Sequence, residues 1–162
     1  GVLFDVALQV DKILAIKHLA QDLGVPKFFL NARTDLYWRK DVISFDTEDA
    51  RFEETLSRLM QYKAAGADGV FIPGLTDLSL ISKLSEVIAL PINVQKGPWT
   101  LEEAKSSGVS RISTGSALFR ASIQNIKEIS TGLVDDPKRL EHFSPTVTYK
   151  EVNRHFNNGV SL

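Results

Sequence analysis

The sequence contains no cysteine, which excludes disulfides, thiolate metal sites and a cysteine nucleophile and fits a cytoplasmic protein. Its histidines, His18, His142 and His155, form neither an HxxH nor an HExxH pattern, which argues against a histidine metal site. No apolar run approaches the roughly 18 residues that span a bilayer. The net charge of −1, without a run of like charges, argues against binding nucleic acid or an anionic membrane.

The composition is that of an ordinary globular domain. The chain has 162 residues, of which 43% are hydrophobic and 24% charged. This length suits one domain, and the apolar content is enough to build a core. The first residues, GVLFDVALQVDK, lack the basic start and small-residue cleavage site of a signal peptide.

Short apolar runs alternate along the chain with segments of helical periodicity. The apolar runs predict strands at 27–32, 69–73, 91–95 and 110–114, and the periodic segments predict helices at 6–24, 46–66, 76–88, 100–108 and 115–129. Strands that are covered by helices on both faces are continuous apolar runs without alternation. The pattern therefore predicts an α/β fold with a parallel sheet.

Capping residues mark several helix ends. Asp46 is the predicted N-cap of the second helix and Thr76 that of the third. Thr100 is followed three positions later by Glu103, which is the pattern of a capping box. Gly66 is placed to end the second helix.

The pattern changes near residue 130. Glycine, proline and aspartate interrupt the sequence there, and a short helix is predicted over TYKEVNRHF, residues 148–156. We therefore expect a domain over 1–130 and a C-terminal extension over 131–162 that is helical and packs on the domain exterior or on a partner.

Polar residues follow the apolar part of several predicted strands. In FFLNARTDLYW, residues 28–38, we expect Phe28 and Phe29 to lie inside the sheet and the polar residues to reach its edge. The polar residues at strand ends are Asn31, Arg33, Thr34, Asp35, Asn93, Gln95, Lys96, Ser113, Thr114 and Ser116. Active sites of parallel α/β proteins lie beyond the carboxyl ends of the strands, so these residues mark the expected site.

Arg33 is the residue best suited to bind a ligand there. Its guanidinium can grip a carboxylate or phosphate through two parallel hydrogen bonds. The alternative is that Arg33 pairs with Asp35 or Asp68 and fixes a loop. Asn93 has the same two interpretations, since its amide could line the site or cap a neighbouring loop.

Four segments in order, NARTD, AGADGVFIPGL, LPINV and GVSRISTGSALFRA, resemble the C-terminal half of the isocitrate lyase / phosphoenolpyruvate mutase superfamily, and the phosphonomutase-like branch most closely. The resemblance covers about residues 8–130. It implies a (β/α)₈ TIM barrel, of which this chain carries about the last four strands and helices plus the helical extension. Such barrels run to about 250 residues.

The resemblance also implies chemistry. The superfamily makes or breaks C–C or C–P bonds in small pyruvate-type carboxylic acids through an enolate that Mg²⁺ stabilises. By this resemblance Arg33 and Asp35 belong to the substrate-binding site, and Asn93 lines the pocket. The Mg²⁺ ligands are expected in an N-terminal half that precedes Gly1, so no catalytic or metal-binding residue is assigned within this chain.

The sequence departs from the family pattern in two ways, of which the first is that 162 residues are too few for the whole barrel. The second is that lyases of the superfamily carry a glutamate where this chain has Pro73, which argues against methylisocitrate cleavage. RISTGSALFRA could instead hold a phosphate at a helix N-terminus in another barrel family. A non-catalytic half-barrel that serves as an interaction domain is the other alternative. Because the sheet would have open edges, we expect a homo-oligomer or pairing with an N-terminal half.

Overall fold

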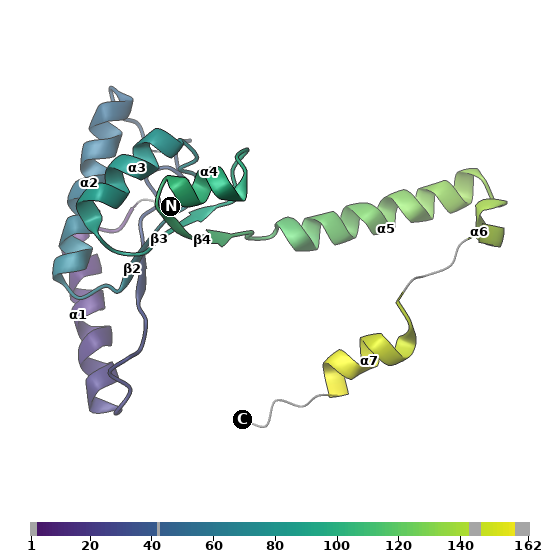
Figure 1. Cartoon of the computed structure of the whole chain (residues 1–162), viewed down its shortest axis with the longest axis horizontal. Helices are drawn as coiled ribbons and strands as arrows, with labels where there is room; N and C mark the ends of the chain where they lie inside the picture. Colours follow the sequence, from purple (N-terminus) through teal and green to yellow (C-terminus); the bar gives the residue numbers. More distant parts are fainter. Residues whose placement is uncertain (1–2, 42, 143–146, 158–162) are drawn as a thin grey trace. The chain divides into compact units, whose positions relative to one another are not determined.

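The computed structural model describes residues 3–41, 43–142 and 147–157. The chain divides into two compact units, Gly1–Gly115 and Ser116–Leu162. The first unit alternates strands and helices, and the second is helical (Figure 1). The residues of the candidate site all lie in the first unit.

The sheet of the first unit is parallel throughout. Its strands are β1 (Asn31–Arg33), β2 (Gly69–Ile72), β3 (Ile92–Gln95) and β4 (Val109–Ser113), and they lie in the order β1-β2-β3-β4. Each neighbouring pair is parallel. The predicted α/β fold with adjacent parallel strands is confirmed.

Four helices connect and cover these strands: α1 (Val6–Asp22), α2 (Glu48–Ala64), α3 (Leu78–Ile88) and α4 (Leu101–Ser106). Figure 1 shows α1 beside α2, and these two helices are in contact, as are α2 and α3. The predicted capping box of α4 is present, with the Thr100 and Glu103 side chains each accepting from the other residue's backbone N–H.

Two predicted N-caps were wrong by one residue. The N-cap of α2 is Thr47, whose hydroxyl accepts a hydrogen bond from the N–H of Ala50. The N-cap of α3 is Asp77, whose carboxylate accepts from the N–H groups of Ser79 and Leu80. In both cases the capping side chain is the one that reaches the free N–H groups of the first turn.

The first strand is shorter and later than the predicted 27–32. The backbone N–H of Leu30 bonds the Asp68 carboxylate at 2.8 Å, so it is not paired to a neighbouring strand. Phe28 and Phe29, which we expected inside the sheet, are each 52% exposed. The N–H of Phe28 bonds the carbonyl of Val25, which holds that residue in a turn.

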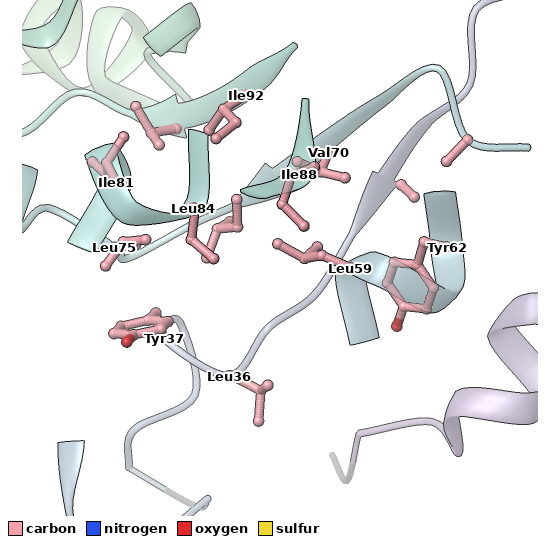
Figure 2. Packing of buried hydrophobic residues seen from close by; sticks show 14 of the residues in the cluster. Leu36, Tyr37, Leu59, Tyr62, Val70, Leu75, Ile81, Leu84, Ile88 and Ile92 are labelled. Carbon is pink, nitrogen blue, oxygen red and sulfur yellow. The ribbon is translucent and has the colours of Figure 1, made fainter. Parts of the chain in front are cut away.

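The core lies between the sheet and its helices. Figure 2 shows Leu59 and Tyr62 of α2 close to Val70 of β2 and Ile88 of α3. The side chains that share this cluster are almost completely removed from solvent, and they include Leu59, Tyr62, Val70, Ile72, Ile81, Leu84, Ile88, Ile92 and Val94. Burial of such side chains is the main stabilising contribution to the unit.

The second unit contains α5 (Ala117–Asp135), α6 (Arg139–His142) and α7 (Tyr149–Asn157). The domain boundary expected near residue 130 falls within α5, and the division into domains stays a prediction. No side chain of α5 is buried, and Leu118, Phe119 and Ile126 are among its exposed apolar residues. Within the described residues, no helix is both long and apolar enough to cross a membrane.

Candidate functional site

One row of side chains crosses the sheet on the face opposite the core. In the strand register Arg33 pairs with Phe71, Phe71 with Asn93, and Asn93 with Arg111. Successive side chains of a strand point to opposite faces. The neighbours of this row along the strands, such as Ala32 and Val94, belong to the core, so the row lies on the other face of the sheet. We call this the open face.

Arg33 stands at the carboxyl end of β1 and is paired with Asp35. The two atoms Nε of Arg33 and Oδ1 of Asp35 are 2.5 Å apart. The guanidinium carbon also lies 5.5 Å from the centroid of the Phe71 ring. Among the described residues, no hydrogen-bond acceptor engages the two terminal Nη groups of Arg33. Both groups are therefore available to an anionic ligand.

The alternative prediction was that Arg33 pairs with Asp35 or Asp68. Arg33 does pair with Asp35, and Asp68 is not its partner. Asp68 instead binds Lys17 of α1, with 2.8 Å between Nζ and Oδ2. Burial by itself would raise the pKa of Asp68, but the hydrogen bond from the Leu30 N–H and the Lys17 ammonium bring that pKa below its usual value. Asp68 therefore ties α1 to the segment that leads into β1.

The loop after β1 is fixed from two sides. Arg51 of α2 is buried and donates to the carbonyls of Leu36 at 2.5 Å and Ile43 at 3.2 Å. On the other side, Gly74 has a φ of 82°, and a Cβ there would lie 2.6 Å from the carbonyl oxygen of Tyr37. The loops that follow β1 and β2 therefore approach each other through a glycine.

Tyr37 and Trp38, in the same loop, differ in exposure. Tyr37 is buried, and burial, followed by the nearby Glu48 carboxylate, raises its pKa far above the usual value. This shift favours the protonated form of the phenol. Trp38 is exposed on the loop.

Asn93 lies in the middle of the row and is only 4% exposed. Its Oδ1 accepts a hydrogen bond from the Ser113 hydroxyl at 3.1 Å. This contact joins β3 to β4, so Asn93 does not cap a loop as its alternative interpretation proposed. Its amide nitrogen carries two N–H donors, and none of the described residues accepts from them.

A cleft of about 450 Å³ opens beside Arg33. Its lining includes the cationic side chains of Lys12, Arg33, Arg39 and Arg58 against one carboxylate, that of Asp35. The hydroxyl of Thr34, which also lines the cleft, is buried and has no hydrogen-bond partner among the described residues. Arg39 and Arg58 are paired with Asp41 and Glu54, so the cationic groups left to a small anion are Lys12, which no described carboxylate pairs, and the Nη groups of Arg33.

A second cavity, of about 290 Å³, lies over the open face. Its lining includes Asn31 of β1, Asn93 of β3 and Arg111 of β4. The sequence analysis did not select Arg111 as a site residue. The alternation of side chains between the two faces of a strand could have identified Arg111, because Arg111 stands two positions before Ser113 and so shares a face with Ser113.

The Mg²⁺ that the resemblance implies would need oxygen ligands, chiefly carboxylates. In the part of the chain that the structure describes, no three His, Asp or Glu side chains gather to hold a metal. The carboxylate of Asp35, at the end of β1, is bound by Arg33. Mg²⁺ binds through carboxylates and waters in near-octahedral geometry, which this paired carboxylate alone does not supply.

Comparison with solved structures identifies the fold. A Burkholderia cenocepacia J2315 protein provisionally named a phosphonomutase matches with a TM-score of 0.72 and 34% identity, over 85% of this chain and 53% of the other. The 2,3-dimethylmalate lyase of the PEP mutase/isocitrate lyase superfamily matches with a TM-score of 0.73 and 21% identity, over 94% and 52%. The parallel sheet and its helices thus correspond to half of a TIM-barrel-like fold.

Comparison of sequences identifies the family. An uncharacterised Mycobacterium tuberculosis protein, Rv1998c, is 32% identical over 151 residues, which are 93% of this chain and 52% of the relative. The chain therefore spans about half the length of the curated relatives it matches. The model of the family described as phosphoenolpyruvate phosphomutase matches residues 1–134. The chain belongs to this phosphoenolpyruvate phosphomutase family.

Proposed function

We propose that the native protein makes or breaks a C–C or C–P bond in a small pyruvate-type carboxylic acid through an enolate. The observation that carries this proposal is the state of Arg33. It stands at the carboxyl end of a strand, in a cleft that Lys12 also lines, with both terminal nitrogens free of partners among the described residues. The planar guanidinium binds a carboxylate well because it can donate two parallel hydrogen bonds to the two carboxylate oxygens.

In this proposal Arg33 binds the substrate carboxylate through its Nη groups while Asp35 holds its Nε. The ion pair restricts the rotation of the guanidinium, so less side-chain entropy is lost when substrate binds. Asn93 offers its amide N–H groups from the middle of the open face. Donors that are fixed in this way stabilise the negative charge that builds up on an enolate oxygen.

Pro73 bears on the type of reaction. It follows β2 at the carboxyl end, where lyases of the superfamily carry a glutamate, and it is buried. A proline has no side-chain group that can transfer a proton or bind a cation. We therefore propose a phosphonomutase-like or related reaction in preference to cleavage of methylisocitrate.

The partners and location are part of the proposal. Among the described residues β1 and β4 are each paired with a strand on one side only, which supports a homo-oligomer, or pairing with an N-terminal half of the barrel. The absence of cysteine from the sequence supports a cytoplasmic location. Dependence on Mg²⁺ is also part of the proposal, and its support is the resemblance to the superfamily.

The test is a substrate screen on the native protein, expressed from its complete reading frame. Pyruvate-type acids such as oxaloacetate and phosphonopyruvate are compared with phosphorylated sugars, with and without Mg²⁺. Turnover of the acids with a kcat/KM that falls about ten- to hundredfold in Arg33→Lys supports the proposal. Turnover of phosphorylated sugars would favour the other phosphate-binding barrels, and a folded protein inactive on both classes would favour the interaction domain.

A further inference from the structure

We propose that Asn31, Asn93 and Arg111 form a carboxylate-binding subsite on the open face, separate from the contact made by Arg33. The three residues come from β1, β3 and β4 and line one cavity of about 290 Å³. The inference rests on the proposed function only in taking the open face as the side that binds substrate.

The pairing of the arginines points to Arg111. Four arginines of the first unit lie within ion-pair distance of a carboxylate: Arg33 with Asp35, Arg39 with Asp41, Arg51 with Glu48 and Arg58 with Glu54. Arg111 is the remaining arginine of that unit, and none of the carboxylates that the structure describes reaches it. Arg111 is an exposed residue, so its guanidinium is accessible to an anion, which it can bind through two parallel hydrogen bonds.

Asn93 is the second observation. It is nine-tenths or more buried, its Oδ1 is already engaged by Ser113, and its amide N–H groups have no acceptor among the described residues. It borders the same cavity as Arg111 and stands opposite it in the register. The guanidinium of Arg111 and the amide N–H donors of Asn93 therefore belong to residues that line the same cavity.

This donor set selects the chemistry of the ligand. A carboxylate is acceptor-only and can take the two N–H groups of an arginine together with an amide N–H. A metal cation would meet a positive charge at Arg111 and no carboxylate among the residues that line the cavity. The cavity volume suits a small anion, or one end of a small dicarboxylate.

The carboxylate can have two sources. Pro91 and Ile92, which precede Asn93, also line the cavity, so it extends toward the amino ends of the strands. In barrels that end is associated with stability, and the carboxyl end with the active site. The carboxylate is therefore either that of a free ligand or that of an acidic side chain elsewhere in the protein. Both use the same contacts, and the experiment separates them.

The experiment measures malonate and acetate binding to the native protein by calorimetry, together with its thermal melt. The variants are Arg111→Gln, Arg111→Lys and Arg33→Lys. Lys83→Gln is the control, because it removes one positive charge from an exposed position of α3. For a free ligand, Arg111→Gln weakens malonate binding by about ten- to hundredfold with an unchanged melt. Arg111→Lys weakens it less, and Lys83→Gln leaves it unchanged.

For an internal acidic side chain, Arg111→Gln lowers the melting temperature, Arg111→Lys restores part of it, and malonate binding does not change. Either result supports a carboxylate at Arg111. The proposal is overturned if Arg111→Gln changes neither binding nor the melt beyond the control. Loss of binding in Arg33→Lys, with both normal binding and an unchanged melt in Arg111→Gln, would overturn the subsite and leave the proposed function in place. If the protein binds malonate through Arg111 but turns over none of the acids, the subsite is supported and the proposed function fails.

Discussion

The Nε of Arg33 lies 2.5 Å from the Oδ1 of Asp35, two residues further along the chain. The side chains are 48% and 31% exposed, and exposed ion pairs contribute at most about 1 kcal/mol to stability. The ion pair therefore contributes little to the stability of the loop. It does fix the direction of the guanidinium and leaves its terminal nitrogens uncommitted, which is the arrangement expected of a ligand-binding arginine.

Arg33→Lys should lower kcat/KM of the native protein by about ten- to hundredfold, because one charge-assisted hydrogen bond of about 1.5–3 kcal/mol is lost with the planar fork. The melting temperature should stay unchanged, since Arg33 lies outside the core. Steady-state kinetics beside a thermal melt test this. Arg139→Lys is the control, because Arg139 is an exposed arginine paired with Asp136 at 3.8 Å. Normal kinetics in Arg33→Lys would leave the arginine with a structural role only.

Asp35→Asn should show whether the Asp35 carboxylate acts by orienting Arg33 or by stabilising the fold. The free energy of unfolding should fall by less than about 1 kcal/mol, as for exposed pairs in general. We expect kcat/KM to fall about tenfold, because Arg33 loses the contact that orients it. The double variant with Arg33→Lys should be no worse than Arg33→Lys alone, since both changes act on one contact. Additive losses in kcat/KM would show that Asp35 acts independently of Arg33.

Arg51→Met should destabilise the fold by about 2–4 kcal/mol, because two loop carbonyls lose a buried charged donor. Urea unfolding measures the change. Lys40→Met is the matched control: Lys40 pairs with Glu48, the same carboxylate that lies near Arg51, but its side chain is 49% exposed. We expect the control to lose less than about 1 kcal/mol. Equal losses in the two variants would mean that the carbonyl contacts of Arg51 contribute little.

Asp68 should make stability depend on pH at the acidic end. Its pKa is lower in the folded protein than the ordinary value of 3.8, so the unfolded chain binds the proton more readily. The stabilisation is complete above that ordinary value and is lost as the pH falls through the folded pKa. The free energy of unfolding of the wild type should therefore exceed that of Asp68→Asn at pH 6, with the difference shrinking below about pH 4. A difference that is constant down to pH 2 would contradict this assignment.

Much of the local structure follows from the sequence. The capping box of Thr100 and Glu103 formed as predicted, because its contacts span three residues and depend on nothing else. The parallel order of the strands also followed from the alternation of apolar runs with helices. The placement of β1 did not, because Phe28 and Phe29 have a strand-like composition but the Leu30 N–H bonds the Asp68 carboxylate. That contact joins residues 38 positions apart, which no local pattern reports.

From the sequence by itself, Arg33 and Asp35 could be placed at the end of one strand of a parallel sheet and Asn93 within another strand. Only the tertiary structure decided which side chains share a row. The register between β3 and β4 shifts between Ile92 and Asn93: Ile92 pairs with Val109, but Asn93 pairs with Arg111. Without that shift Ser110 would stand opposite Asn93. One extra residue in a strand exchanges the faces of all that follow, and its position depends on hydrogen bonds between strands and not on the sequence of either strand alone.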